Sequence, residues 1–179
     1  MSEQLGRYSG LQKALHWIIA ALIVGQVAAG LTMTNLADGP AKNALYELHK
    51  SAGLTVLALA LVRVAVRSMR GAPSLEPMPD WQRRAAHASH YAMYVLIVLV
   101  PLAGWTATSS CCPPLNLFWT VPLTLPVPGD EAFWKAVFRI HFALAFMLAT
   151  IALIHMAAAL HHHLVRRDRT LLRMLPGGE

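Results

Sequence analysis

Long apolar stretches alternate along the chain with short polar segments. Four of these stretches are long enough to cross a hydrocarbon core of about 30 Å, which takes roughly 20 residues of helix. They cover residues 14–36, 45–66, 87–108 and 132–160, and we expect the last helix to continue to residue 163. The pattern predicts one domain over residues 1–179, an all-α four-helix bundle that is integral to a membrane.

The composition is that of a protein surrounded by lipid. Of the 179 residues, 56% are hydrophobic and only 13% are charged, and the mean hydropathy is +0.46. Such values are typical of chains that expose apolar surface to a bilayer. The polar segment 1–13 and the full length of the first apolar stretch indicate a retained helix rather than a cleaved signal peptide.

The basic residues divide unequally between the two sides of such a bundle. The larger group lies on the side of the two termini: Arg7, Lys13, Arg63, Arg67, Arg70, Arg83, Arg84, Arg166, Arg167, Arg169 and Arg173. The other side carries only Lys42, Lys50, Lys135 and Arg139. An excess of Lys and Arg marks the cytoplasmic side, so both termini are expected there. This distribution accounts for the net charge of +6 without a nucleic-acid partner, and the expected partner is membrane lipid.

Four histidines fall within the apolar stretches, and the topology places them in two pairs. With both termini on the cytoplasmic side, His16 and His155 share the inner depth, whereas His49 and His141 share the outer depth. His141 and His155 are fourteen residues apart on one helix, which separates them by about 21 Å along its axis and about 40° around it. The spacing therefore predicts two facing imidazole pairs at opposite depths.

Facing imidazoles suit the axial ligation of six-coordinate haem iron, in which each ring leaves its second nitrogen to another acceptor. An ionisable side chain in a spanning helix is costly and usually faces a partner or a functional site. The sequence has no Cys-x-x-Cys-His attachment motif, so two haems of type b are expected. Packing or hydrogen bonding between helices is the alternative role for a membrane histidine.

A zinc or copper site is a second alternative, because histidine also binds these ions. Zinc sites usually recruit Cys, Asp or Glu beside histidine. Glu47 is close to His49 in sequence, but two residues along a helix turn its side chain away by about 200°. Haem is favoured over a metal-ion carrier.

The two cysteines, Cys111 and Cys112, are adjacent and precede Pro113 and Pro114. Neighbouring cysteines rarely meet the geometry of a disulfide, so we expect a pair of free thiols with a structural role on the oxidising side of the membrane, with a redox role as the alternative. Five prolines between Cys111 and Asp130 predict a stiff, extended loop over the outer haem. Asp130 is expected to cap the last helix.

Several local motifs resemble the bacterial cytochrome b561 family, and in particular its short four-helix diheme cytochromes, which include superoxide oxidase. The resemblance covers essentially the whole chain. It rests on residues 15–17 (Leu-His-Trp), 48–53 (Leu-His-Lys-Ser-Ala-Gly), 87–90 (His-Ala-Ser-His), 155–163, and 168–176 with its Thr-Leu-Leu-Arg-Met-Leu-Pro ending.

This resemblance implies the same ligand pairs as the topology, with the inner haem held by His16 and His155 and the outer haem by His49 and His141. It also implies a quinone site near the cytoplasmic face of a bacterial inner membrane.

The family's quinone-contacting positions correspond to His90 and His162. An imidazole that titrates near neutral pH can give a hydrogen bond or a proton to a quinone oxygen. Alternatively, the histidine run at residues 161–163 is an exposed helix end at the membrane–water interface.

By this resemblance, electrons pass from superoxide, oxidised to dioxygen on the periplasmic side, through two haems to ubiquinone. The four basic residues of the outer side would form a positive patch that attracts the superoxide anion. Arg63 and Arg67 at the inner end either pair with haem propionates or extend to lipid headgroups.

Similar four-helix diheme units also serve as membrane-anchor and electron-relay subunits of multisubunit dehydrogenases and hydrogenases. In that alternative, a redox protein partner rather than superoxide supplies the electrons.

Overall fold

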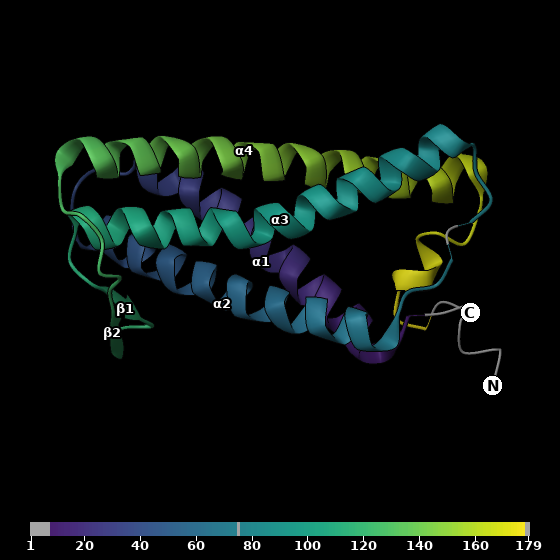
Figure 1. Ribbon diagram of the computed structural model, residues 1–179, viewed down its shortest axis with the longest axis horizontal. Coiled ribbons are helices and arrows are strands. Elements are labelled where there is room, and N and C mark those ends of the chain that lie inside the picture. Colours follow the sequence, from purple (N-terminus) through teal and green to yellow (C-terminus); the bar gives the residue numbers. More distant parts are fainter. Residues whose placement is uncertain (1–7, 75, 178–179) are drawn as a thin grey trace.

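The computed structural model describes residues 8–74 and 76–177. Four long helices lie side by side in an elongated bundle: α1 (Gly10–Asn35), α2 (Pro40–Arg70), α3 (Asp80–Cys111) and α4 (Glu131–His161) (Figure 1). Each is long and apolar enough to span a membrane, which confirms the predicted four-helix membrane fold. α2 and α3 extend beyond the predicted apolar stretches at both ends. α1 ends at Asn35 instead of residue 36, and α4 ends at His161 instead of residue 163, where a π-helical turn follows.

The extensions arise because polar residues at the membrane surface continue and cap the helices. Ser9 and Gln12 form a capping box at the start of α1. Pro40 occupies the first turn of α2, where its missing N–H costs nothing. Asp130 caps α4 by accepting a 2.8 Å hydrogen bond from the Phe133 N–H, as the sequence predicted. Hydropathy locates the lipid-facing part of a helix, whereas these caps set its ends.

The helices pack as neighbours in the orders α1–α2, α2–α3 and α3–α4. Few apolar side chains are buried inside the bundle, while large ones such as Val24, Tyr91 and Phe146 lie on its outer surface. An apolar exterior is the expected surface of a bundle surrounded by lipid. Among the described residues, α1 and α4 do not pack closely on each other, and histidine side chains lie between them.

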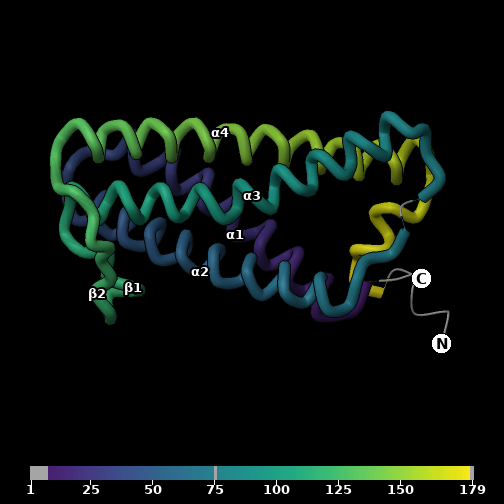
Figure 2. The backbone as a smooth tube through the Cα atoms, in the orientation of Figure 1, coloured from purple at the N-terminus to yellow at the C-terminus, as the bar shows by residue number. Residues whose placement is uncertain are grey.

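The bundle has two distinct ends. At the terminal end, α1 starts, α2 ends, α3 starts and α4 ends, followed by a π-helical turn η2 (His162–Arg166) and a 3-10 turn η3 (Leu172–Met174). At the hairpin end, strands β1 (Leu115–Leu117) and β2 (Val121–Leu123) pair antiparallel between α3 and α4. Figure 2 shows the chain after α4 crossing the terminal end toward α1 and α2.

This C-terminal crossing segment is tied by three hydrogen bonds to α1 and to the α2–α3 connection. The Lys13 Nζ donates a 2.9 Å hydrogen bond to the Leu175 carbonyl, and the Trp17 indole donates one of 2.8 Å to the Met174 carbonyl. Arg173 bonds the Ser74 carbonyl in the α2–α3 connection. The segment therefore closes the terminal end of the bundle beside His16, the neighbour of Trp17.

The proline-rich connection at the hairpin end contains strands where only an extended loop was predicted. The pairing register places Leu115 opposite Leu123 and Leu117 opposite Val121. Leu115 is 2% exposed and fixes the start of the hairpin in the bundle. Proline stiffness made the extended backbone predictable, whereas the strand pairing depends on contacts with α2.

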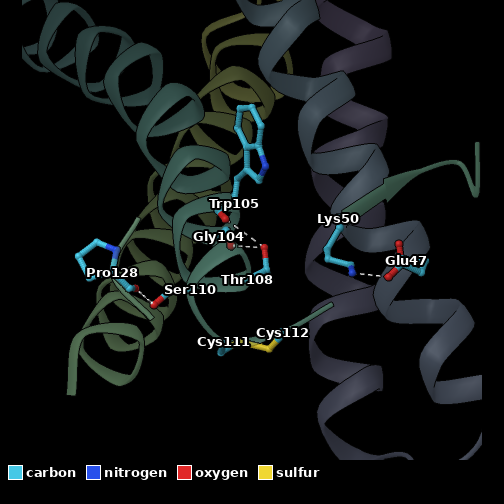
Figure 3. Close-up of a disulfide and its surroundings, with 9 residues drawn as sticks. All are labelled: Glu47, Lys50, Gly104, Trp105, Thr108, Ser110, Cys111, Cys112 and Pro128. Atoms are coloured by element: carbon cyan, nitrogen blue, oxygen red, sulfur yellow. Dashed lines mark hydrogen bonds and ion pairs between the residues drawn. A yellow bond between two sulfur atoms is a disulfide. The ribbon is translucent and has the colours of Figure 1, made fainter. Parts of the chain in front are cut away.

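The prediction of free thiols is wrong, because Cys111 and Cys112 form a disulfide (Figure 3). Cys111 is the last residue of α3, and Cys112 has an extended backbone conformation. The chain changes direction between the two residues, which lets adjacent sulfur atoms meet. The expectation rested on the general rarity of disulfides between adjacent cysteines and did not consider this local backbone geometry.

Candidate functional site

The structure brings the four spanning histidines together in two pairs between helices. The ring centres of His16 on α1 and His155 on α4 are 6.4 Å apart, with planes inclined by 77°. Those of His49 on α2 and His141 on α4 are 6.3 Å apart, with planes inclined by 83°. One pair lies toward the terminal end and the other toward the hairpin end, so α4 contributes one ring to each.

The spacing of both pairs fits a haem iron between the rings. A metal–imidazole nitrogen bond is about 2 Å long and the ring centre lies about 1 Å further back, so trans ligands have centres about 6 Å apart. The described residues contain no group of three or more His, Cys, Asp and Glu side chains arranged to hold a metal ion. Two opposed imidazoles without a third donor fit a haem better than a metal ion held by side chains alone.

His141 is oriented by α3. Its Nδ1 lies 2.9 Å from the Val100 carbonyl oxygen. Because a carbonyl only accepts, Nδ1 carries the proton and Nε2 is left free for a metal. Gly104 allows this position, since a Cβ there would lie 2.9 Å from the His141 Cε1 and 3.0 Å from its Nδ1. Sequence reasoning missed this role of Gly104.

His49 is positioned by α1. The Gln26 side chain donates a 2.8 Å hydrogen bond to the His49 carbonyl. Gly53 leaves room for that amide, because a Cβ there would lie 3.1 Å from the Gln26 Nε2. The His49 Nδ1 is buried and has no hydrogen-bond partner among the residues that the structure describes. A buried imidazole nitrogen without a partner costs free energy that a bound group would recover.

The two histidines predicted for a quinone site lie in different surroundings. The His90 ring on α3 packs edge-on against His155, with centres 5.1 Å apart, which is shorter than the spacing of either facing pair. His162 on η2 contacts Asp168 instead, with 2.5 Å between its Nδ1 and Oδ2. Within residues 8–74 and 76–177, no hydrogen bond or ring contact joins His90 to His162. Their shared role in quinone binding stays a prediction.

Asp168 and Thr170 are polar partners of His162 that sequence reasoning missed. Burial acts to raise the pKa of Asp168, but hydrogen bonds from Thr170 and His162 outweigh it and lower the pKa to about 2. The Thr170 N–H donates to Asp168 Oδ1 at 2.9 Å. The carboxylate is therefore ionised where it meets the imidazole. The sequence signal that could have indicated these partners is the position of an Asp and a Thr, Asp168 and Thr170, shortly after the histidine run.

Two arginines at the terminal end face a small cavity between α1, α2 and α3. The Arg63 Nη1 donates a 3.1 Å hydrogen bond to the Gln12 carbonyl, one turn before His16. The Arg67 guanidinium lies 5.9 Å from the centre of the Tyr94 ring. Among the described residues, neither arginine forms an ion pair with an acidic side chain, although both line the cavity. The site is suited to a carboxylate ligand.

The predicted positive patch at the hairpin end is largely neutralised. Lys42 pairs with Asp38 at 2.8 Å. Ion pairs also join Lys50 to Glu47 and Lys135 to Glu131. The acidic partners lie three or four residues away on the same helix or at its start, a spacing that the count of basic residues alone overlooked. Electrostatic attraction of an anion is therefore weaker than the sequence suggested.

The chain matches the family model of prokaryotic cytochrome b561 over residues 7–177. It is 34% identical over 176 residues to cytochrome b561 homolog 2 of Escherichia coli K12, covering 94% of this chain and 91% of the relative. It is 33% identical over 180 residues to cytochrome b562 of Cereibacter sphaeroides, covering 98% of each chain. It is 28% identical over 179 residues to the probable superoxide oxidase CybB of Yersinia pestis, covering 95% of this chain and 96% of the relative.

The protein therefore belongs to the prokaryotic cytochrome b561 family. It is therefore a multi-pass membrane protein that transfers electrons with b-type haem.

Replacement of Gly104 tests the fit of the pair at the hairpin end. We expect Gly104→Ala to displace the His141 ring and to lower the haem content per polypeptide of the purified protein. Gly25→Ala is the matched control, because a Cβ at Gly25 meets nothing within 4 Å. The pyridine haemochrome spectrum, together with the protein concentration, gives the ratio of haem to polypeptide. Equal haem content in the two variants would show that Gly104 does not make room for His141.

The depressed pKa of Asp168 predicts how its contribution to stability depends on pH. Because the folded pKa of about 2 is below the ordinary 3.8, the contribution is complete above about pH 4 and declines as the pH falls toward 2. The difference in thermal midpoint between the wild type and Asp168→Asn should therefore shrink over that interval. Thermal melts from pH 6 to pH 2.5 measure it. A difference that stays constant contradicts the assigned pKa.

Proposed function

We propose that this protein carries electrons across a bacterial inner membrane through two b-type haems, oxidising superoxide to dioxygen and reducing ubiquinone. The observation that carries the proposal is the presence of two facing histidine pairs with nearly equal ring spacings of 6.4 and 6.3 Å. His16 and His155 would hold one haem, and His49 and His141 the other. When bound, the haems supply one-electron redox chemistry, which no side chain of the chain provides.

The protein's first contribution is to hold the ligands rigidly. His141 and His155 share α4, so about 21 Å of continuous helix fixes their separation along the axis. The hydrogen bond from His141 to the Val100 carbonyl fixes that ring's orientation and increases the basicity of its free nitrogen. The contact of His90 with His155 supports the other ring from α3.

The second contribution is charge at the terminal end. Arg63 and Arg67 would bind the carboxylates that a haem carries, because each guanidinium lies at the cavity near His16 without an acidic partner among the described side chains. A guanidinium binds a carboxylate with two parallel hydrogen bonds. This arrangement would neutralise both propionates at a depth where free charges are costly.

The third contribution is proton delivery to ubiquinone at the terminal end of the bundle. We place this end on the cytoplasmic side of the membrane because most Lys and Arg residues lie there. Reduction of a quinone to a quinol takes two electrons and two protons. His162 and His90 would contact the quinone, and Asp168 is the positioning residue for His162. The carboxylate accepts from His162 Nδ1, which directs the other ring nitrogen away from Asp168.

Superoxide is proposed as the electron donor at the hairpin end, which would face the periplasm. The two termini lie at the opposite end of the bundle and would therefore face the cytoplasm. The support for this donor is the similarity over nearly the whole chain to a relative named probable superoxide oxidase. Because three of the four basic residues at this end are paired with carboxylates, we expect only modest electrostatic acceleration of the encounter.

The haem ligands are tested by substitution on α4. We expect His141→Ala and His155→Ala each to lower the haem content from about two to about one per chain, because each removes one ligand of one pair. His163→Ala, on the same segment but outside both pairs, should keep the wild-type content. Haem and protein are quantified on the same samples. A full complement of haem in His141→Ala would exclude that pair.

The donor is tested with the oxidised, haem-containing protein in detergent. We expect superoxide generated enzymatically to reduce the haem absorption bands, and superoxide dismutase to abolish that reduction. Bands that respond only to a strong chemical reductant would instead favour the relay subunit of a larger complex, with a redox protein as donor. A parallel assay with added ubiquinone should reoxidise the bands, more slowly in Asp168→Asn than in the wild type.

A further inference from the structure

The disulfide between Cys111 and Cys112 lies at the joint between α3 and the β-hairpin, at the end of the bundle that carries the His49–His141 pair. The Cys112 side chain is exposed and Cys111 is partly exposed. The following Pro113 and Pro114 are exposed as well, so the disulfide is accessible from the solvent side. None of the proposed electron-transfer steps uses it.

On the far side of this joint, the hairpin bonds directly to the turn of α2 that carries His49. The Asn116 N–H donates to Glu47 Oε2 at 3.1 Å, and the Phe118 N–H donates to Ser51 Oγ at 2.9 Å. Ser51 Oγ in turn donates to the Asn116 carbonyl at 3.4 Å. We call these three bonds the hairpin–α2 contact. Glu47 and Ser51 flank His49 by two residues each, and Ser51 is 0% exposed.

On the near side of the joint, α3 forms the wall against His141. Gly104 and Cys111 are seven residues apart, which places them on one helix face about 10 Å apart along the axis. Gly104 is the residue that makes room for the His141 ring. The disulfide therefore lies between α3, which positions His141, and the hairpin, which contacts the α2 turn that carries His49.

We propose that Cys111–Cys112 is a thiol-exchange site for an extracytoplasmic dithiol, and that its reduction loosens the hairpin–α2 contact over the His49–His141 pair. A bridge between adjacent residues restricts the backbone on both sides of their peptide bond, and its opening restores that freedom at the base of the hairpin. The regulation of the haem site in this proposal rests on the proposed function, whereas the exchange and the loosening do not.

The exchange is balanced in atoms and electrons. One thiolate of the dithiol attacks the exposed Cys112 sulfur, the bond to Cys111 breaks, and Cys111 leaves as a thiolate that takes up a proton. The second thiolate of the dithiol then attacks its own partner sulfur in the mixed disulfide, which releases Cys112 as a thiolate that is protonated in turn. Two electrons pass to the cysteine pair, and the external dithiol becomes a disulfide.

Amide hydrogen exchange of the haem-containing protein, with dithiothreitol as the dithiol, tests the proposal. We expect two alkylated thiols per chain after reduction and none before. We expect exchange at the Asn116 and Phe118 amides to accelerate by about tenfold on reduction, because these amides form the hairpin–α2 contact. Cys111→Ser/Cys112→Ser should exchange fast without dithiothreitol and should not respond to it.

Ser51→Ala is the second variant, since it removes the two Ser51 bonds of the hairpin–α2 contact while the disulfide and the Asn116–Glu47 bond remain. It should show fast exchange at Phe118 whether or not the disulfide is reduced. Unchanged protection of both amides in the reduced wild type, or a disulfide that dithiothreitol leaves intact, would overturn the proposal. Haem spectra of the same samples separate the disulfide proposal from the proposed function. Faster amide exchange on reduction in a protein that shows no haem spectrum contradicts only the proposed function. Normal reduction of the haems by superoxide, with amide exchange unchanged on disulfide reduction, contradicts only the disulfide proposal.

Discussion

The structure depends on the cost of placing imidazoles inside a membrane. A polar ring in a hydrocarbon core needs a polar partner or a bound group, and the two histidine pairs face each other across the space between α4 and the α1–α2 layer. Because α1 and α4 do not pack closely on each other in the described chain, the rings take the place of direct helix contacts. The two haems proposed for these pairs would account for both the ring spacing and the sparse packing.

The surrounding helices are adapted to these rings at single residues. Gly104 gives space to His141, and the Val100 carbonyl fixes its tautomer. Gln26 bonds the backbone at His49, and Gly53 gives space to Gln26. At the terminal end, the crossing C-terminal segment brings Asp168 to His162. Each adaptation uses a small residue or a hydrogen bond, and each acts on a single ring or on the residue that bonds it.

Much of this arrangement could be predicted from the sequence, because it follows from long-range regularities. Bilayer thickness determined the four helices, and helix count with charge asymmetry placed His16 level with His155 and His49 level with His141. The missed features depend on where a side chain points after folding. The disulfide at the end of α3 and the partner of His162 require backbone directions at helix ends, which hydropathy does not encode. The ion pair of Lys50 with Glu47 follows from a three-residue helical spacing that a count of basic residues does not consider.

The electron paramagnetic resonance spectrum of the oxidised protein tests the central claim most directly, because it reports the ligands of each iron. The two pairs of steeply inclined imidazoles predict two low-spin ferric haems per chain, both with strongly anisotropic signals and neither with a high-spin component. A single low-spin centre per chain, or a high-spin signal from an iron with one histidine ligand, would contradict the account.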